Sequence, residues 1–366
     1  MMMRAAQCSN YGRNVDDILT VVADAPRPIF EPAAKECRGH AFVRVQATAL
    51  APGDVRVMGG RTREIQGPPS IPYIPGGADL CGVVEAVAEG EIYLKAGDRV
   101  VCQFAQNWGG LAEYALVKSG HCARDPPACL TSAEAAAIGS SGASAVVISR
   151  EVKEGDRVLV IGGSGGVGSF LVQLARKKGA SFVAAVSTQT DLMKELGVDR
   201  AVDYRQEDVW ALEEFQMEEG RFDVVFDLVE KGWDRLTSAE GRSRPIVKNG
   251  RQGGRFVTTV PPCGKSFDGH SFWQIAGVFV FPVLGKTVST MLWPWGGPRY
   301  KFAFGLGIDA ERTPFTELFA LIEAGDVRVV LDGGSPCGFT TEELRTAFKL
   351  QGSGHAHGKV VVQISD

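Results

Sequence analysis

The amino-acid sequence predicts an α/β protein in which a doubly wound parallel sheet accompanies a second, β-rich domain. Three observations lead to this prediction. The chain has 366 residues, enough for two domains. Its first third consists of short strand-like runs separated by glycine and proline. From Arg157 onward, apolar strand patterns alternate with helical patterns, which indicates a parallel sheet.

Short strands dominate the first third. Ala41–Ala47 alternates apolar and polar residues as a half-buried strand does, and Cys81–Val87 and Asp98–Cys102 are further strand candidates. Prolines and glycines between positions 68 and 77 exclude regular structure there. We therefore expect a loop-rich, mostly antiparallel β domain.

The pattern changes at Thr131–Glu134, which has the sequence of a capping box and opens an alanine-rich helix. A helix is expected over Val167–Lys178, ending before Gly179, and another over Pro314–Glu323, before a final strand at Lys359–Ile364. The parallel strands are expected at Arg157–Ile161, Phe182–Ser187, Ala201–Tyr204, Phe222–Leu228 and Arg255–Val260.

The composition argues against general nucleic-acid binding, which needs a basic face. Lys and Arg number 39 against 43 Asp and Glu, a net charge of −4. The eight cysteines include no C-x-x-C pair, so we expect free buried thiols rather than disulfides.

Two segments of the sequence are relevant to the cellular location of the protein. Met1–Gln7 shows neither a secretory signal core nor a transit-peptide pattern, so we expect a cytoplasmic protein from the sequence as given, with mitochondrial or plastid import left open. The apolar stretch Phe272–Leu284 is shorter than the about 20 residues of a membrane span. We expect it to be a buried strand and pocket wall, and a peripheral membrane contact stays open.

The clearest functional signal is a glycine-rich loop between the first parallel strand and the helix after it. Its glycines satisfy G-x-G-x-x-G, a pattern in which glycines permit the tight turn, the approach of a pyrophosphate and the packing of helix on sheet. The free N–H groups of the helix N-terminus then face the phosphates. The alternative is a merely tight turn. The predicted contact residues are Gly163, Ser164, Gly165, Gly166, Val167 and Gly168.

The end of the second parallel strand predicts which dinucleotide is bound. NAD sites usually place an Asp or Glu there, about 20 residues after the glycines. Here the strand ends in Ser187 and Thr188, which could donate hydrogen bonds to a 2′-phosphate, and Tyr204 and Arg205 could add a phenol and a cation. NADPH is therefore favoured over NADH. The alternative is a generic polar loop with a solvated Arg205.

The sequence contains no recognisable metal-binding motif. The five histidines form no H-x-x-x-H pair with a partner acid on an expected helix, and the cysteines lack zinc-site spacing. We expect no metal site, although spacing leaves open a site assembled from distant residues.

The order of motifs along the chain carries a family resemblance. The motifs are PGGADLCGVVEAV (Pro75–Val87), KAGDRV (Lys95–Val100), GGLAEYALV (Gly109–Val117), TSAEAAAIGSSGASA, GGSGGVG, LGVDRAVDY (Leu196–Tyr204) and GHAHGKVVV (Gly354–Val362). In this order they resemble the medium-chain dehydrogenase/reductase superfamily, in its zinc-free quinone oxidoreductase (zeta-crystallin-like) branch. The segment Lys286–Gly307 is similar to the reticulon-4-interacting protein group.

This resemblance implies a groES-like catalytic domain made of residues 1–130 and 310–366, with a Rossmann NADP-binding domain, 131–309, inserted between them. It implies NADPH in the interdomain cleft, with Ser144, Val260 and Lys359 as further cofactor-binding residues. It also implies a homodimer formed through a Rossmann-edge strand around Lys301–Gly305.

The sequence departs from the family pattern at several positions. Zinc-dependent relatives have a cysteine and a histidine where this sequence has Ala51 and Asp79. Many quinone oxidoreductases have Asn-Pro at Ala51-Pro52 and an aromatic residue near Arg56, so a side chain expected to polarise a substrate carbonyl is missing or replaced. His357 stands where the close group has Arg.

The residues and the resemblance together predict a zinc-independent, NADPH-dependent oxidoreductase that reduces quinones or α,β-unsaturated carbonyls by hydride transfer. No catalytic side chain is assigned, and water, Arg56 or a backbone N–H could supply the proton. The alternative is an NADPH-binding structural or regulatory subunit with little turnover. Residues that could line an apolar substrate pocket, or simply form core, are Phe104, Trp273, Phe279 and Phe304.

Overall fold

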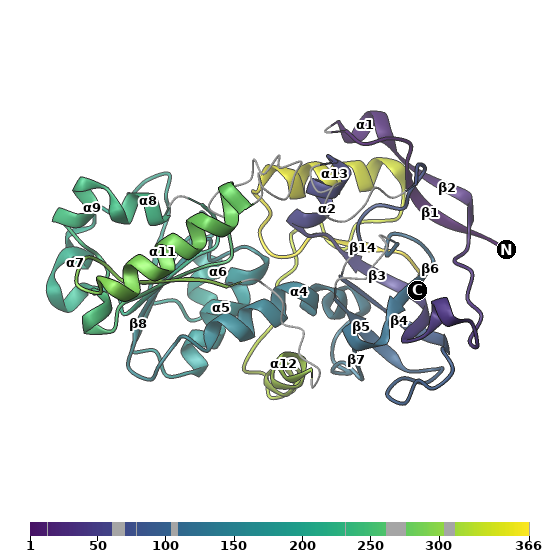
Figure 1. Ribbon diagram of the computed structural model, residues 1–366, viewed down its shortest axis with the longest axis horizontal. Helices are drawn as coiled ribbons and strands as arrows, with labels where there is room; N and C mark the ends of the chain where they lie inside the picture. The colour runs from purple at the N-terminus through teal and green to yellow at the C-terminus, as the bar shows by residue number, and fades with distance from the viewer. Residues whose placement is uncertain are drawn as a thin grey trace. The chain divides into compact units, whose positions relative to one another are not determined.

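The chain forms two compact units. The computed structural model describes residues 1–12, 14–60, 70–77, 79–103, 109–230, 232–260, 276–303 and 312–365. The terminal unit consists of Met1–Ala143 and Gly307–Asp366, and the central unit is Ser144–Leu306 (Figure 1). The first boundary lies within the alanine-rich helix α4 (Ser132–Ser149).

The terminal unit is built on an antiparallel sheet. Its strand order is β14-β3-β4-β5-β7, with β6 paired to β3, and β1 and β2 form a separate ribbon. Buried and half-buried residues alternate along most of β3, as its sequence predicts. The strands are β1 (Met2–Cys8), β2 (Leu19–Pro26), β3 (His40–Ala49), β4 (Asp79–Val87), β5 (Arg99–Cys102), β6 (Tyr114–Lys118), β7 (Cys122–Arg124) and β14 (Val361–Gln363). The expected antiparallel β domain is confirmed.

Helices complete the terminal unit. The C-terminal helix α13 (Thr341–Ser353, yellow in Figure 1) packs against α1 (Val15–Ile18) and α2 (Pro52–Met58) from the other end of the chain. The unit also contains α12 (Thr313–Glu323). The predicted capping box begins α4: the Thr131 N–H donates to the Glu134 carboxylate at 2.9 Å, and the Glu134 N–H donates to Thr131 Oγ1 at 3.2 Å.

The central unit is built on a fully parallel sheet. Its order is β10-β9-β8-β11-β12-β13, the 3-2-1-4-5-6 order of a Rossmann fold. The strands are β8 (Arg157–Ile161), β9 (Phe182–Val186), β10 (Arg200–Val202), β11 (Val224–Asp227), β12 (Arg255–Thr258) and β13 (Arg299–Phe302), and the helices include α5 (Gly166–Lys177), α6 (Thr190–Glu195), α7 (Glu213–Gln216), α8 (Gly232–Thr237), α9 (Ala239–Ser243) and α11 (Phe281–Leu292). All five expected parallel strands are present, and β13 forms the outer edge.

The expectation of a buried strand at Phe272–Leu284 is wrong for its described part. Ala276–Val280 forms a π-helical turn that leads into α11, and Phe281 and Leu284 are 56% and 54% exposed. Pro282 lies in the first turn of α11. Within the described residues, no helix is long and apolar enough to span a membrane.

Candidate functional site

The glycine-rich loop leaves the carboxyl end of β8 and enters α5. Gly162 has a φ of +89°, a conformation that favours glycine. The N–H groups of Gly162 and Gly163 both donate to the Val186 carbonyl at 3.1 Å, and the Gly165 N–H donates to the Gly162 carbonyl at 3.2 Å. These bonds fasten the loop to the end of β9, so that it lies at the carboxyl edge of the sheet.

The three motif glycines differ in what surrounds them. A Cβ on Gly168 would lie 2.2 Å from the Gly162 carbonyl oxygen, and one on Gly163 would lie 2.8 Å from both the Ala185 Cβ and the Met193 sulfur. Both glycines are therefore needed for packing. A Cβ on Gly165 would meet only the Gly162 oxygen, at 3.4 Å. Gly165 thus borders open space that a side chain would fill and that a phosphate can approach.

The N-terminus of α5 faces the same loop. Gly165 is the N-cap residue, so the N–H groups of Gly166, Val167 and Gly168 have no partner inside the helix. No loop hydrogen bond recorded for the described part of the chain uses these three groups. The first turn of α5 contains no acidic residue. The loop and the helix end together fit the pyrophosphate of a dinucleotide.

The ends of β9 and β10 lie side by side, because the Ser187 N–H donates to the Val202 carbonyl at 3.0 Å. Ser187 is buried, and its hydroxyl oxygen accepts the Gln189 N–H at 2.9 Å, so the hydroxyl hydrogen stays free to be donated. Thr188 is half-buried and Tyr204 is 56% exposed.

An acid that no sequence motif predicted lies at the end of β10. Asp203 directly follows β10, and its carboxylate accepts the Arg205 Nε at 3.1 Å and the Arg205 Nη2 at 2.9 Å. These bonds lower the pKa of Asp203. The Arg205 side chain is 63% exposed, so it is a solvated charge, but it is not an isolated cation because it forms a bidentate pair that neutralises Asp203. The sequence feature that could have identified this acid is its position directly before Tyr204, at the end of an expected strand.

Asp227 is a second acid that no sequence motif predicted. It ends β11 and accepts the N–H groups of Val229 and Glu230 at 3.1 Å and of Gly232 at 2.8 Å. Burial raises its pKa. This carboxyl group orders the loop after β11, which lies beside the glycine loop because a Cβ on Gly162 would lie 2.7 Å from Val229. The sequence feature that could have identified Asp227 is its position at the end of a run of apolar strand residues.

The other predicted site residues are distributed over both units. Val260 follows β12, and its N–H donates to Thr258 Oγ1 at 3.0 Å, while Ser144 is a buried residue of α4 in the central unit. Phe279 contacts Phe302 edge-to-face, with ring centroids 5.2 Å apart. Arg56 is a half-buried residue of α2 in the terminal unit. Phe104, Trp273 and Phe304 lie outside the described residues.

Lys359 belongs to a buried charged cluster inside the terminal unit. Its ammonium group donates to the Leu50 carbonyl at 2.9 Å and to the Asp79 carboxylate at 3.4 Å. Asp79 also accepts the Ser140 N–H at 2.9 Å and the Ser140 hydroxyl at 2.5 Å. Both oxygens of Asp79 are therefore in use, and the carboxylate occupies the break in α4 at Gly139.

Asp54 lies in the same cluster. Its carboxylate accepts the Ala51 N–H at 2.7 Å and thereby holds the start of α2. Burial and the nearby Asp79 carboxylate raise the pKa of Asp54 to about 7, against opposing contributions from the Ala51 bond and from Lys359. Among the residues that the structure describes, no group of three or more His, Cys, Asp or Glu side chains is arranged to hold a metal ion.

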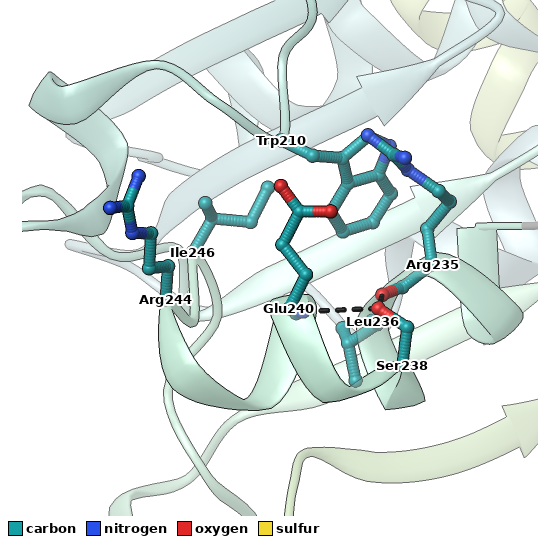
Figure 2. A pocket seen from close by; sticks show the side chains of 8 residues that line it. Trp210, Arg235, Leu236, Ser238, Glu240, Arg244 and Ile246 are labelled. Carbon is teal, nitrogen blue, oxygen red and sulfur yellow. Dashed lines mark hydrogen bonds between the residues drawn. The ribbon is translucent and has the colours of Figure 1, made fainter.

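A small pocket lies elsewhere in the central unit. Figure 2 shows Trp210, Arg235, Glu240 and Arg244 around it, beside α8 and α9. It holds about 20 Å³, room for a water molecule but not for a nucleotide. None of the predicted site residues lines it.

Comparisons with known proteins agree with this geometry. The model of the zinc-binding dehydrogenase family matches residues 196–362, and that of the alcohol dehydrogenase GroES-like domain matches residues 38–127. The chain is 28% identical to a chloroplastic NADPH-dependent alkenal/one oxidoreductase of Arabidopsis thaliana, covering 98% of this chain and 79% of that protein. It is also 28% identical to the mitochondrial NAD(P)H oxidoreductase RTN4IP1 of Danio rerio, covering 100% and 92%.

The fold is shared with solved structures. Escherichia coli quinone oxidoreductase, solved with NADPH, has a TM-score of 0.72 at 20% identity, covering 98% of this chain and 99% of that one. The two family matches and the relatives extend over both units, which have the expected antiparallel and Rossmann sheets. This chain therefore belongs to the medium-chain dehydrogenase/reductase superfamily, among relatives that include an alkenal/one oxidoreductase and RTN4IP1 proteins.

Proposed function

We propose that the protein is a zinc-independent, NADPH-dependent oxidoreductase acting on quinones or α,β-unsaturated carbonyls. The observation that carries the proposal is the open space at Gly165 beside the unpartnered N–H groups of α5. Relatives named as NADPH-dependent alkenal/one oxidoreductase and trans-enoyl reductase support the reaction class. Zinc independence is supported by Ala51, which offers no ligand atom, and by Asp79, whose oxygens bind Ser140 and Lys359.

The chain's own residues bind and orient the cofactor. NADPH, when bound, supplies the hydride for the reduction. The N–H groups of Gly166, Val167 and Gly168 hold the pyrophosphate, and Gly165 leaves room for it. Ser187 and Thr188, with Arg205 held on Asp203, recognise the 2′-phosphate. Asp227 keeps the neighbouring loop in place.

A cofactor and substrate panel tests this function. The purified chain is mixed with NADPH or NADH and with a naphthoquinone, a phenanthrenequinone, a 2-alkenal or a saturated aldehyde, and the nicotinamide absorbance is followed. We expect NADPH oxidation with quinones or with the alkenal, but not with the saturated aldehyde. NADPH binding without turnover on any acceptor would overturn the enzyme assignment in favour of a binding subunit.

Cofactor choice gives a separate prediction. Ser187→Asp would place a carboxylate at the end of β9 beside the neutralised Asp203–Arg205 pair. Close like charges cost about 1–4 kcal/mol, so NADPH affinity is expected to fall about tenfold or more, with NADH affected less. Ser187→Asn, neutral and similar in size to Asp, is the control. Equal affinities for NADH and NADPH in the unaltered chain would contradict this role for the strand end.

We further propose a homodimer formed along β13. This strand ends the sheet order, and an edge strand is a template for pairing with another chain. α11, which packs against β13, continues into Trp293 and Trp295. The exposed apolar residues of this face are Phe281, Leu284, Val288, Met291, Leu292, Trp293 and Trp295.

Sedimentation tests the dimer. The unaltered chain is expected to sediment as a dimer at micromolar concentration, and a Leu284→Lys/Met291→Lys variant as a monomer, because the new charges would be buried in the interface. Ile92→Lys, at a 98% exposed position of the terminal unit, should leave the dimer intact. A monomeric unaltered chain would contradict the proposal.

A further inference from the structure

Two fully buried cysteines face each other across neighbouring strands of the terminal unit. Cys102 on β5 is the direct partner of Cys122 on β7, and their sulfur atoms lie 3.0 Å apart. The structure describes seven cysteines, and among them Cys102 and Cys122 have their sulfur atoms in direct contact. Neither residue belongs to the candidate dinucleotide site.

The hydrogen bonds between β5 and β7 show which kind of cross-strand pair the two cysteines form. The Gln103 N–H donates to the His121 carbonyl at 3.0 Å, and the Asp125 N–H donates to the Arg99 carbonyl at 2.9 Å. Hydrogen-bonded and non-hydrogen-bonded pairs alternate in an antiparallel ladder, so Cys102 and Cys122 form a non-hydrogen-bonded pair. The Cα atoms of such pairs are about 4.5 Å apart, within the range that a disulfide spans. The two sulfurs need only approach each other by about 1 Å, with the backbone in place.

We propose that Cys102 and Cys122 are an oxidisable dithiol that closes to a cross-strand disulfide in the folded protein. The oxidant is a low-molecular-weight disulfide such as oxidised glutathione. The Cys122 thiolate attacks it, forming a mixed disulfide and releasing one small thiolate. The Cys102 thiolate then attacks the Cys122 sulfur and releases the second. Two protein thiols become one disulfide, the small disulfide becomes two thiols, and the two cysteine protons go to the leaving thiolates.

The position of β7 explains how buried thiols can react. β7 has three residues and lies at the margin of the sheet (Figure 1), so it can separate from β5 without the other strands parting. Burial and the Cys122 sulfur hold the pKa of Cys102 well above its usual range. While β7 is closed, both thiols are shielded from solvent. Oxidation therefore reports the opening of this edge strand.

The disulfide would fix a second contact of β7. The Arg312 guanidinium donates to the Cys122 carbonyl at 2.6 Å and to the Ser119 carbonyl at 3.1 Å. Arg312 directly precedes α12, so these bonds join that helix to the edge strand. Linking Cys102 to Cys122 would also enclose residues 103–121 in a covalent loop. We expect the oxidised terminal unit to open less at β7 and to unfold at a higher temperature.

Oxidation of the full chain tests the proposal. The reduced protein is incubated with oxidised glutathione, alkylated under denaturing conditions and mapped by peptide mass spectrometry. We expect Cys102 linked to Cys122 without bound glutathione, a glutathione adduct on exposed Cys129, and a melting temperature raised by about 5–10 °C that returns on reduction. Cys102 and Cys122 both remaining thiols, even in urea just below the unfolding transition, would overturn the proposal.

Two variants separate the pair from general thiol reactivity. Cys102→Val fills the core position but removes the resolving thiol, so glutathione is expected to stay on Cys122. Cys81→Ala removes an equally buried cysteine of β4 that pairs with Val101 instead, and it should oxidise as the unaltered chain does. A disulfide that maps to Cys81 would also overturn the proposal. If Cys102→Val fails to fold, Cys122→Ser is used in its place. This variant is expected to lose the cross-link and to keep the glutathione adduct on Cys129.

Discussion

A Gly165→Val variant is expected to fold like the unaltered chain and to bind NADPH at least about a hundredfold more weakly. Gly165 has a φ of −71° and a ψ of 173°, an extended conformation that valine adopts readily. Its added Cβ would meet only the Gly162 oxygen, at an ordinary 3.4 Å, so the loop itself is not strained. The branched side chain would instead occupy the space that the pyrophosphate needs. Fluorescence titration with NADPH measures the loss, and circular dichroism checks the fold.

Two glycines provide the controls for this experiment. Gly285 lies exposed in α11 with no atom near an added Cβ, so Gly285→Val should change neither fold nor binding. Gly168→Ala should lower stability as well as binding, because its Cβ would lie 2.2 Å from the Gly162 carbonyl oxygen. A folded Gly165→Val protein with undiminished NADPH affinity would mean that the cofactor binds elsewhere.

The second large effect concerns Asp54. Its pKa of about 7 in the folded protein lies above the ordinary 3.8, so the folded chain keeps a proton that the unfolded chain releases between these values. The contribution of Asp54 to the free energy of unfolding is therefore largest below about pH 4, and it decreases as the pH rises to about 7. The shift corresponds to at most about 4 kcal/mol. Asp54→Asn, which can still accept the Ala51 N–H, is expected to be more stable than the unaltered chain above pH 7.

Thermal unfolding between pH 5 and pH 8.5 measures this effect. The stability advantage of Asp54→Asn should grow with pH up to about 7 and then level off. Asp24→Asn, at an exposed position of β2, removes a carboxylate without this environment and should show no such growth. An unchanged pH profile in Asp54→Asn would show that Asp54 does not titrate in this range.

The central unit could be predicted from the sequence because its signals are local. Arg157–Ile161 is an apolar strand, and the glycines and the helix follow it directly. This combination of strand, glycine-rich turn and helix is specific to a small class of folds. The same locality made the loop recognisable as a dinucleotide site. The capping box at Thr131 was equally readable, because its two bonds join residues three positions apart.

The errors and omissions have three separate physical causes. Asp203 was overlooked because its effect depends on Arg205 folding back onto it, which no spacing rule states. The apolar stretch before Leu284 was read as buried, although hydrophobicity alone does not distinguish a core strand from an exposed helix face. The Asp54–Asp79–Lys359 cluster joins residues from distant parts of the chain, so its charges could not be paired before the fold was known.

The discontinuous terminal unit has a consequence for synthesis on the ribosome. The central unit is one continuous stretch, whereas the terminal unit needs both chain ends. The bond between Leu50 and Lys359 joins residues 309 positions apart. At about 5–20 residues per second, translation places roughly 15–60 s between these two residues. During that interval β3 lacks its partner β14 and Asp79 lacks its counter-ion, so the nascent N-terminal segment must be kept from misfolding until synthesis ends.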